Sequence, residues 1–295
     1  MVEQQSIKSG QITREMRAWV RENVQPGDGY LPTCESIERE IVARGGSPAF
    51  PTGIGVNDVT AHYSPQGGDQ STFNEKDLIK IDFGVHIEGY LTDTSVTLTF
   101  NPDHEAIIEA TERALKAAIE TLKKDKRTGE IGRVVYHEAS KYGFRTIENL
   151  TGHTVDRYVV HAGRSVPNVY TPGAQQLRTG DVVAIEPFLT PKSAAGYVVD
   201  SPVETIFSVL LRKNTGDREL DAFLAKVWDE RKTLPFTPRW YADEYGEAKL
   251  GSILKQLVKK RIVRSYPTLV EASGNPVAQF EHTVALETDG IVVLT

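Results

Sequence analysis

The sequence predicts an α+β fold in which two similar halves surround one site and a small helical segment interrupts the second half. Residues 78–100 alternate apolar and polar side chains, which is typical of a β-hairpin. Residues 103–124 and 129–142 instead carry apolar side chains at helical spacing. From 211 to 266 the pattern is mostly helical, and it returns to strands over 277–294. A chain of 295 residues has room for one large domain with an insert of this size.

The composition is that of an ordinary globular protein. Hydrophobic residues make up 39% of the chain and charged residues 25%, which excludes the disordered, collagenous and coiled-coil classes. A net charge of −6 argues against general binding of nucleic acids or membrane surfaces. The single cysteine, Cys34, cannot form an intramolecular disulfide, and we find no secretory signal and no spanning apolar run. We therefore expect a cytoplasmic protein without membrane contact.

The first helices and strands can be predicted from the spacing of apolar residues and from the glycines and prolines between them. Helical spacing over 5–24 and 34–44 predicts two helices, and the glycines at 45 and 46 end the second. Residues 47–63 are rich in proline and glycine, which indicates a structured loop or short strands. Asn101 and Pro102 predict the start of the third helix, and Gly143 the end of the fourth. Short strands are expected at 158–161 and 181–186.

The helical insert has its own internal pattern. Amphipathic stretches at 218–232 and 247–262 are separated by LPFTPRWY and followed by the extended sequence RSYPTLVE. Helices followed by an extended hairpin resemble a winged-helix module. We therefore divide the chain into a catalytic domain formed by 1–210 and 267–295 and an insert formed by 211–266.

Two pairs of segments repeat a pattern that is built around acidic residues. Residues 76–82 and 180–186 each end on a carboxylate, Asp82 and Glu186. Residues 93–98 and 281–286 each begin on one, Asp93 and Glu281. Two matches in the same order predict a duplicated fold with a pseudo-two-fold site.

These acids lie in strand patterns where burial is costly. A hairpin turn centred on Ile87 and Glu88 would place Asp82 directly opposite Asp93, and facing like charges need a cation or a shared proton. An exposed sheet edge or a shifted register would explain that pair alone equally well. Glu186 and Glu281 are also flanked by apolar residues, and buried acids require pairing or a metal.

A nitrogen ligand is expected beside four carboxylates. His153 follows Gly152, where the chain can approach closely, and His161 and His62 are further candidates. Four carboxylates with one histidine suit a pair of divalent ions such as Co, Mn, Fe or Zn. Such a pair can hold a hydroxide and polarise a carbonyl group.

This ligand set carries a family resemblance. Asp82, Asp93, His153, Glu186 and Glu281 resemble the five-ligand signature of the pita-bread metallopeptidases. The resemblance extends to type II methionine aminopeptidases through the stretches PAFPTGIGVNDVTAHYSP, KIDFGVHIEGYLTDTSVTLTFNP, LTGHTVDRYVVHAG, AIEPF, LPFTPRW and AQFEHTV. The segment 211–266 resembles the insertion that separates type II from type I members. The absence of a long charged N-terminal extension is more like the archaeal members.

The resemblance implies a role for each candidate ligand. Asp93 and Glu281 would bridge two divalent metal ions, with Asp82 on one ion and His153 and Glu186 on the other. A metal-bridging hydroxide would attack the first peptide bond, and Glu186 would also accept a proton. The reaction would remove the initiator methionine from nascent proteins and peptides, with a preference for a small second residue.

The resemblance also implies a substrate pocket. His62 and His161 would lie beside the scissile amide as catalytic residues. The methionine side chain would occupy an apolar pocket. Its lining would be Phe50, His62, Val160, His161, Phe188 and Tyr266.

Two alternatives share the same fold. X-Pro dipeptidases and aminopeptidase P use the same ligand set, but they usually carry a separate N-terminal domain and lack the helical insert. Non-enzymatic pita-bread proteins that bind RNA or ribosomes typically lose metal ligands, and all five candidates are present here. We expect a monomer that acts on N-terminal methionine peptides and nascent chains. The basic run at 255–261 is either a solvated helix face or a transient ribosome contact.

Overall fold

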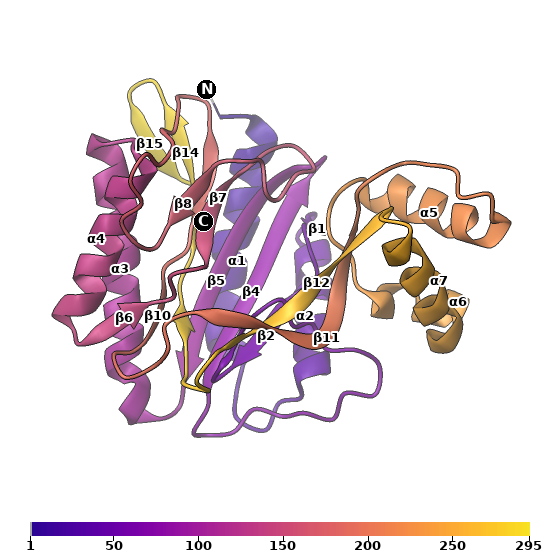
Figure 1. Cartoon of the computed structure of the whole chain (residues 1–295), viewed down its shortest axis with the longest axis horizontal. Helices are drawn as coiled ribbons and strands as arrows, with labels where there is room; N and C mark the ends of the chain where they lie inside the picture. The colour runs from indigo at the N-terminus through magenta and orange to yellow at the C-terminus, as the bar shows by residue number, and fades with distance from the viewer. Residues whose placement is uncertain (1) are drawn as a thin grey trace.

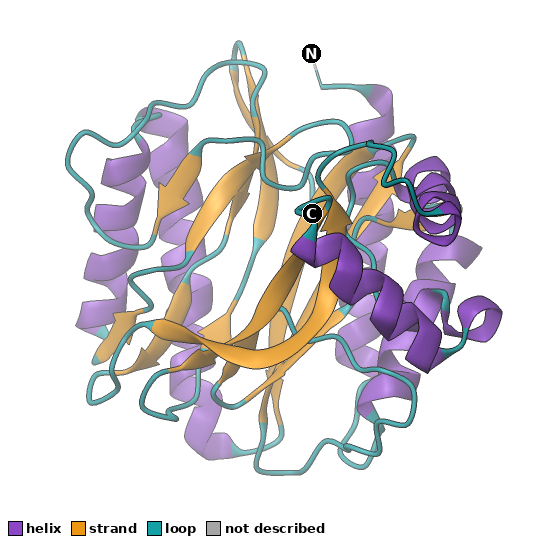
Figure 2. Cartoon of the chain, turned by 45° about the vertical axis from the view of Figure 1, so that its right-hand side comes forward, coloured by secondary structure: helices purple, strands orange, loops and turns teal. Residues whose placement is uncertain are grey.

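A computed structural model describes residues 2–295. Strands fill the middle of the molecule, helices cover its two sides, and a further group of helices stands apart at one end (Figures 1 and 2). The covering helices are α1 (Gln4–Asn23), α2 (Tyr30–Ala43), α3 (Glu105–Lys124) and α4 (Thr128–Lys141). Their positions agree with the helices predicted at 5–24, 34–44, 103–124 and 129–142. No helix in this described part of the chain is long and apolar enough to cross a membrane.

The first half of the fold is organised around one long hairpin. Strand β4 (Leu78–Ile87) pairs antiparallel with β5 (Tyr90–Thr99), and β1 (Ser47–Pro48) and β2 (Gly53–Val56) also pair with β4. Helix α1 packs against both strands of the hairpin. Apolar side chains of β4, including Ile79, Ile81 and Phe83, are fully buried in the main core.

The predicted register of this hairpin was wrong by two residues. Asp82 pairs with Ser95, and Asp93 pairs with Gly84. The reason is the turn, which consists of Glu88 and Gly89 with φ of 52° and 89°. Two successive positive φ angles are the requirement of a type I′ turn, which favours glycine. A shift of two residues preserves the alternation of faces, so Asp82 and Asp93 still project from the same side.

The second half contains the matching pair of acidic strand ends. Its sheet has the order β15 (Gly290–Val293), β14 (His282–Glu287), β9 (Val182–Ile185), β7 (Thr151–Val155) and β8 (Ser165–Pro167). Three shorter strands, β6 (Phe144–Thr146), β10 (Phe188–Pro191) and β13 (Ala278–Gln279), form another sheet. The strand predicted at 158–161 is absent from the described chain. Instead, Asp156 and Val159 close a tight turn in which Tyr158 has a φ of 59°.

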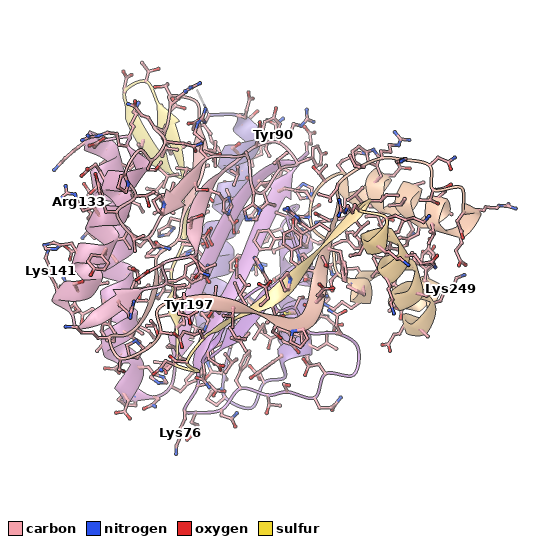
Figure 3. The ribbon with its side chains drawn as sticks, viewed as in Figure 1. Lys76, Tyr90, Arg133, Lys141, Tyr197 and Lys249 are labelled. Atoms are coloured by element: carbon pink, nitrogen blue, oxygen red, sulfur yellow. The ribbon has the colours of Figure 1, made fainter. Side chains whose placement is uncertain are left out.

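The insert leaves and rejoins the body through two long paired strands. Strand β11 (Val198–Val209) pairs with β12 (Val263–Glu271), which also pairs with β3 (Val59–Ala61). Between them lie α5 (Arg218–Arg231), the 3₁₀ turn η2 (Pro238–Trp240), α6 (Ala242–Tyr245) and α7 (Glu247–Lys259). In Figure 3, Lys249 of α7 lies at the end of the molecule opposite Arg133 and Lys141 of α4.

The insert also has a separate hydrophobic cluster, which includes Phe223, Phe236 and Leu257. The predicted division at 210/211 and 266/267 stays a prediction. The helices α5 to α7 lie within the middle segment, and β12 runs across its end.

Candidate metal centre

Five ionisable side chains converge where the two halves meet. Asp82 projects from β4, Asp93 from β5 and His153 from β7, while Glu186 directly follows β9 and Glu281 directly precedes β14. All five line one cavity of about 240 Å³. The register of β14 against β9 pairs His282 with Ile185, so Glu281 and Glu186 leave the sheet at neighbouring points. The two predicted carboxylate pairs therefore reach a common site.

The distances between these groups suit shared coordination. His153 Nε2 lies 3.4 Å from Glu186 Oε1 and 3.6 Å from Asp93 Oδ2. Potential ligand atoms of Asp93, His153 and Glu281 all lie within 4.8 Å of one another, and these three residues are buried. Bonds from zinc to imidazole nitrogen or carboxylate oxygen are about 2.0–2.2 Å long. Atoms at this spacing can therefore surround an ion.

Burial makes the charged state of the four acids costly in the protein alone. It raises the pKa of Asp82 to about 7. Burial, followed by the charges of neighbouring acids, raises the pKa of Asp93, Glu186 and Glu281 well above its usual value. Burial and the charge of His161 lower the pKa of His153 to about 3, so its imidazole is neutral and can act as a ligand.

The surroundings fit a divalent metal ion. Within residues 2–295, no lysine or arginine side chain forms an ion pair with any of the four acids. Asp82 Oδ1 and Glu281 Oε1 are buried without a hydrogen-bond donor. Buried anionic oxygens of this kind require a cation, and carboxylates with one imidazole are ligands that divalent transition ions accept.

The cavity continues from the acids into an apolar pocket. Its wall contains all the residues predicted for the methionine side chain, which are Phe50, His62, Val160, His161, Phe188 and Tyr266. Val160 and Phe188 are buried hydrophobic residues that nevertheless face this space. The lining of the cavity therefore combines ionisable groups with aromatic and aliphatic surface.

Two of these lining residues carry imidazole rings, one beside His153 and the other beside Tyr266. The ring centroid of His161 is 4.1 Å from that of His153, and the ring of His62 meets Tyr266 edge-on at 5.6 Å. Burial lowers the pKa of His161 to about 4 and also lowers the pKa of His62. Both rings are therefore neutral near pH 7, and a neutral imidazole carries one N–H donor and one acceptor nitrogen.

Comparison with known proteins agrees with this geometry. Residues 4–228 match the model of metallopeptidase family M24. The methionine aminopeptidase of Pyrococcus horikoshii is 40% identical over 290 residues, which cover 98% of each chain. That of Methanothermobacter thermautotrophicus is 35% identical over 292 residues, covering 98% of this chain and 97% of the relative. The chain belongs to the methionine aminopeptidases of family M24.

Comparison with solved structures confirms the pita-bread fold. A methionine aminopeptidase from Thermotoga maritima matches with a TM-score of 0.71 at 21% identity, covering 100% of this chain and 98% of that one. A thermophilic Arx1 matches with a TM-score of 0.84 at 17% identity, covering 98% and 89%. The prolidase from Pyrococcus furiosus matches with a TM-score of 0.63 at 16% identity, covering 99% and 62%. With the archaeal relatives at nearly full coverage, the predicted type II membership is also supported.

The structure adds residues to the metallopeptidase site that sequence reasoning missed. Gln279 Nε2 donates to Glu186 Oε2 at 3.3 Å. Gln279 precedes Glu281 by two residues, so strand alternation could have placed both on one face. The cavity is further lined by Pro51, Leu150, Ile206 and Pro235. Pro51, Leu150 and Pro235 lie outside regular elements, where no periodic pattern marks a buried face.

Gly152 controls the placement of the metal-site imidazole. A Cβ at this position would lie 2.3 Å from the backbone oxygen of Ala184, on the neighbouring strand β9. Glycine thus allows β7 to approach β9 closely, directly before His153. The close approach predicted at this position is confirmed.

We expect Gly152→Ala to destabilise the protein by about 2–3 kcal/mol, because the added methyl group must push β7 away from β9. Displacement of His153 should also weaken metal binding. Chemical denaturation and metal titration measure the two effects. Gly251→Ala is the control, because no atom lies within 4 Å of a Cβ there and alanine favours the helix α7. Equal stability of both variants would contradict the role of Gly152.

Proposed function

We propose that this protein removes the N-terminal methionine from proteins and peptides by metal-dependent hydrolysis, with a preference for a small second residue. The observation that carries this proposal is a single cavity lined both by the five candidate metal ligands and by apolar side chains, with Asp93, His153 and Glu281 close enough to share an ion. Because the chain belongs to the methionine aminopeptidases, the side chain that this pocket would bind is that of an N-terminal methionine. Two divalent ions, each of them Co, Mn, Fe or Zn, account for five ligand side chains better than one ion does.

The residues of the chain can perform the steps of hydrolysis. Asp82, Asp93, His153, Glu186 and Glu281 would hold the ions, which when bound supply a Lewis acid for the carbonyl and lower the pKa of water to about 7. The Glu186 carboxylate, held by Gln279, can accept a proton and return it to the leaving amine.

The two neutral imidazoles complete the site. His62 and His161 can each donate a hydrogen bond, one to the developing oxyanion and one to the departing peptide. Because they line the same cavity as the candidate metal ligands, they would lie beside the scissile bond while the first side chain occupies the apolar pocket. This arrangement favours removal of a single residue, and a bulky second residue would collide with the walls around the acids.

The substrate preference can be tested directly with the purified protein loaded with Mn, Fe or Co. We expect cleavage of Met-Ala and Met-Gly peptides and at least about a hundredfold lower kcat/KM for Met-Lys peptides, because a side chain that does not fit costs several kcal/mol. Peptides that begin with alanine or glycine serve as controls for the pocket. Cleavage that depends on proline at the second position would instead indicate an X-Pro peptidase, which the methionine aminopeptidase relatives do not favour.

We further propose that the enzyme is a cytoplasmic monomer that acts on nascent chains through a transient ribosome contact. The supporting feature is the exposed end of α7 and the following turn, which presents Lys255, Lys259, Lys260 and Arg261. We expect the protein to sediment with ribosomes at low salt and to be released at about 0.5 M salt, since phosphate contacts are salt-dependent. Replacement of these four residues by glutamine should abolish sedimentation. If the substituted protein still sediments with ribosomes, the proposed contact is wrong.

A further inference from the structure

The connection between α5 and η2, residues 232–237, forms part of the apolar pocket although it belongs to the insert. Pro235 lines the cavity. Leu234 is buried in a cluster with Ala49 and Val160, and Phe50 packs against the same cluster. The insert therefore contacts the pocket from behind as well as at its surface.

Arg231 anchors one side of this contact. Its guanidinium group is buried and donates to three carbonyl oxygens, those of Pro48 at 2.8 Å, Ala49 at 3.1 Å and Pro235 at 3.1 Å. It also lies 4.8 Å from the ring centroid of Trp240. Among the described residues it forms no ion pair with a carboxylate. All three bonds leave from Nη2, whereas Nε is buried without an acceptor. A buried guanidinium group that donates to backbone oxygens fixes the course of the chain it contacts.

Glu38 anchors the other side. It accepts a hydrogen bond from the backbone N–H of Thr52 at 3.0 Å. Two insert residues hold its carboxylate, Arg239 at 2.8 Å and the indole N–H of Trp240 at 2.8 Å. The loop 48–52 is thus held at both ends through the insert, and Phe50 and Pro51 between these ends line the cavity.

A second lining segment is also tied to the connection. The Thr233 hydroxyl donates to the carbonyl oxygen of Tyr158. Tyr158 belongs to the turn that leads to Val160 and His161, which line the pocket. Two walls that are far apart in the sequence therefore share the insert as their common support.

We propose that Arg231 and Glu38 are positioning residues for the methionine pocket, which set the place of Phe50 by holding loop 48–52 against the insert. This inference rests on the proposed function, since it concerns the same pocket. Neither residue lines the cavity. Loss of either should therefore loosen the fit of the first side chain while the metal ligands on the central strands keep their places.

The test compares Arg231→Met, Arg231→Lys and Glu38→Gln with the metal-loaded parent enzyme on Met-Ala-Ser. We expect Arg231→Met to raise KM about tenfold with kcat within about twofold, because misplacing a binding wall weakens ground-state and transition-state binding alike. Preference for Met-Ala-Ser over Leu-Ala-Ser should fall by a similar factor. Arg231→Lys retains a donor and should recover part of the change. Arg212→Met is the matched control, since that arginine lies over Trp228 on the insert and away from the loop.

A second measurement does not depend on turnover. Hydrogen exchange of the peptide that covers 48–53 should be faster in Arg231→Met and in Glu38→Gln, whereas exchange in β4 and β5 should be unchanged. If Arg231→Met fails to fold, the KM, the selectivity and the exchange rate of Glu38→Gln test the proposal. Unchanged KM, selectivity and exchange in the folded variants would overturn the proposal. A parent enzyme that does not cleave Met-Ala-Ser would overturn the proposed function instead. The hydrogen-exchange result would still test whether Arg231 and Glu38 hold loop 48–52.

Discussion

Replacement of Asp93 by asparagine is expected to lower kcat/KM about a thousandfold or more, because it removes a negative charge from the centre of the ligand cluster. Asp93 Oδ2 faces His153 Nε2, and its ligand atoms are within 4.8 Å of those of Glu281. Metal content, measured on the same preparation by plasma mass spectrometry, should fall together with activity. The fold should persist, since asparagine has the same shape and relieves repulsion among the acids.

Asp103→Asn provides the control for this substitution. Asp103 is an exposed acid in the 3₁₀ turn η1 (Pro102–His104), which precedes α3, so its loss should change neither metal content nor turnover. A fully active Asp93→Asn enzyme with its normal metal content would show that the cluster is not the catalytic centre.

Removal of metal is expected to make stability strongly dependent on pH. The folded-state pKa of Asp82 is raised to about 7, and those of Asp93, Glu186 and Glu281 are also raised. Their unfolded-state pKa values are about 4. Between these values the folded protein binds more protons than the unfolded chain, so stability is present below about pH 4 and is lost as the pH rises through 7.

Calorimetry on chelated and metal-loaded protein measures this effect. The Tm of the metal-free protein should fall by at least about 5 °C between pH 5 and pH 8. Bound cations neutralise the acids, so the loaded protein should show a much smaller change and a higher Tm at pH 8. Asp93→Asn without metal should lose less stability over this range, since one repelling charge is absent. Parallel pH profiles of the loaded and metal-free protein would contradict the assignment.

Much of the site could be predicted because its acids lie within or directly beside strands that are otherwise rich in apolar residues. Acidic residues at echoing positions of apolar strands, such as Asp82 and Glu186, are anomalies that only pairing or a metal resolves. The error in the hairpin register did not affect this conclusion, because a shift of two residues keeps each side chain on its face. The turn itself could have been assigned correctly, since a glycine at position 89 favours a turn centred one residue later.

Other parts of the fold and of the site, such as β11 and Pro235, have no local sequence pattern that predicts them. Strand β11 alternates poorly and contains irregular pairing between Asp200 and Glu204, so its twelve residues did not predict a strand. Pro235 reaches the pocket from a proline-broken connection, and no periodicity relates it to Phe50. Contacts of this kind are fixed by the packing of the insert against the body, which a single sequence does not encode in its local spacing.

The insert begins and ends at neighbouring points of one ladder, since Val209 pairs with Val263. An insert whose two ends lie next to each other can change length during evolution without breaking the sheet that it interrupts. Its middle part is less free to change, because Arg231 and Pro235 also support the substrate pocket. Replacing or deleting the insert should thus leave a folded hydrolase with an altered preference for the N-terminal residue of its substrate.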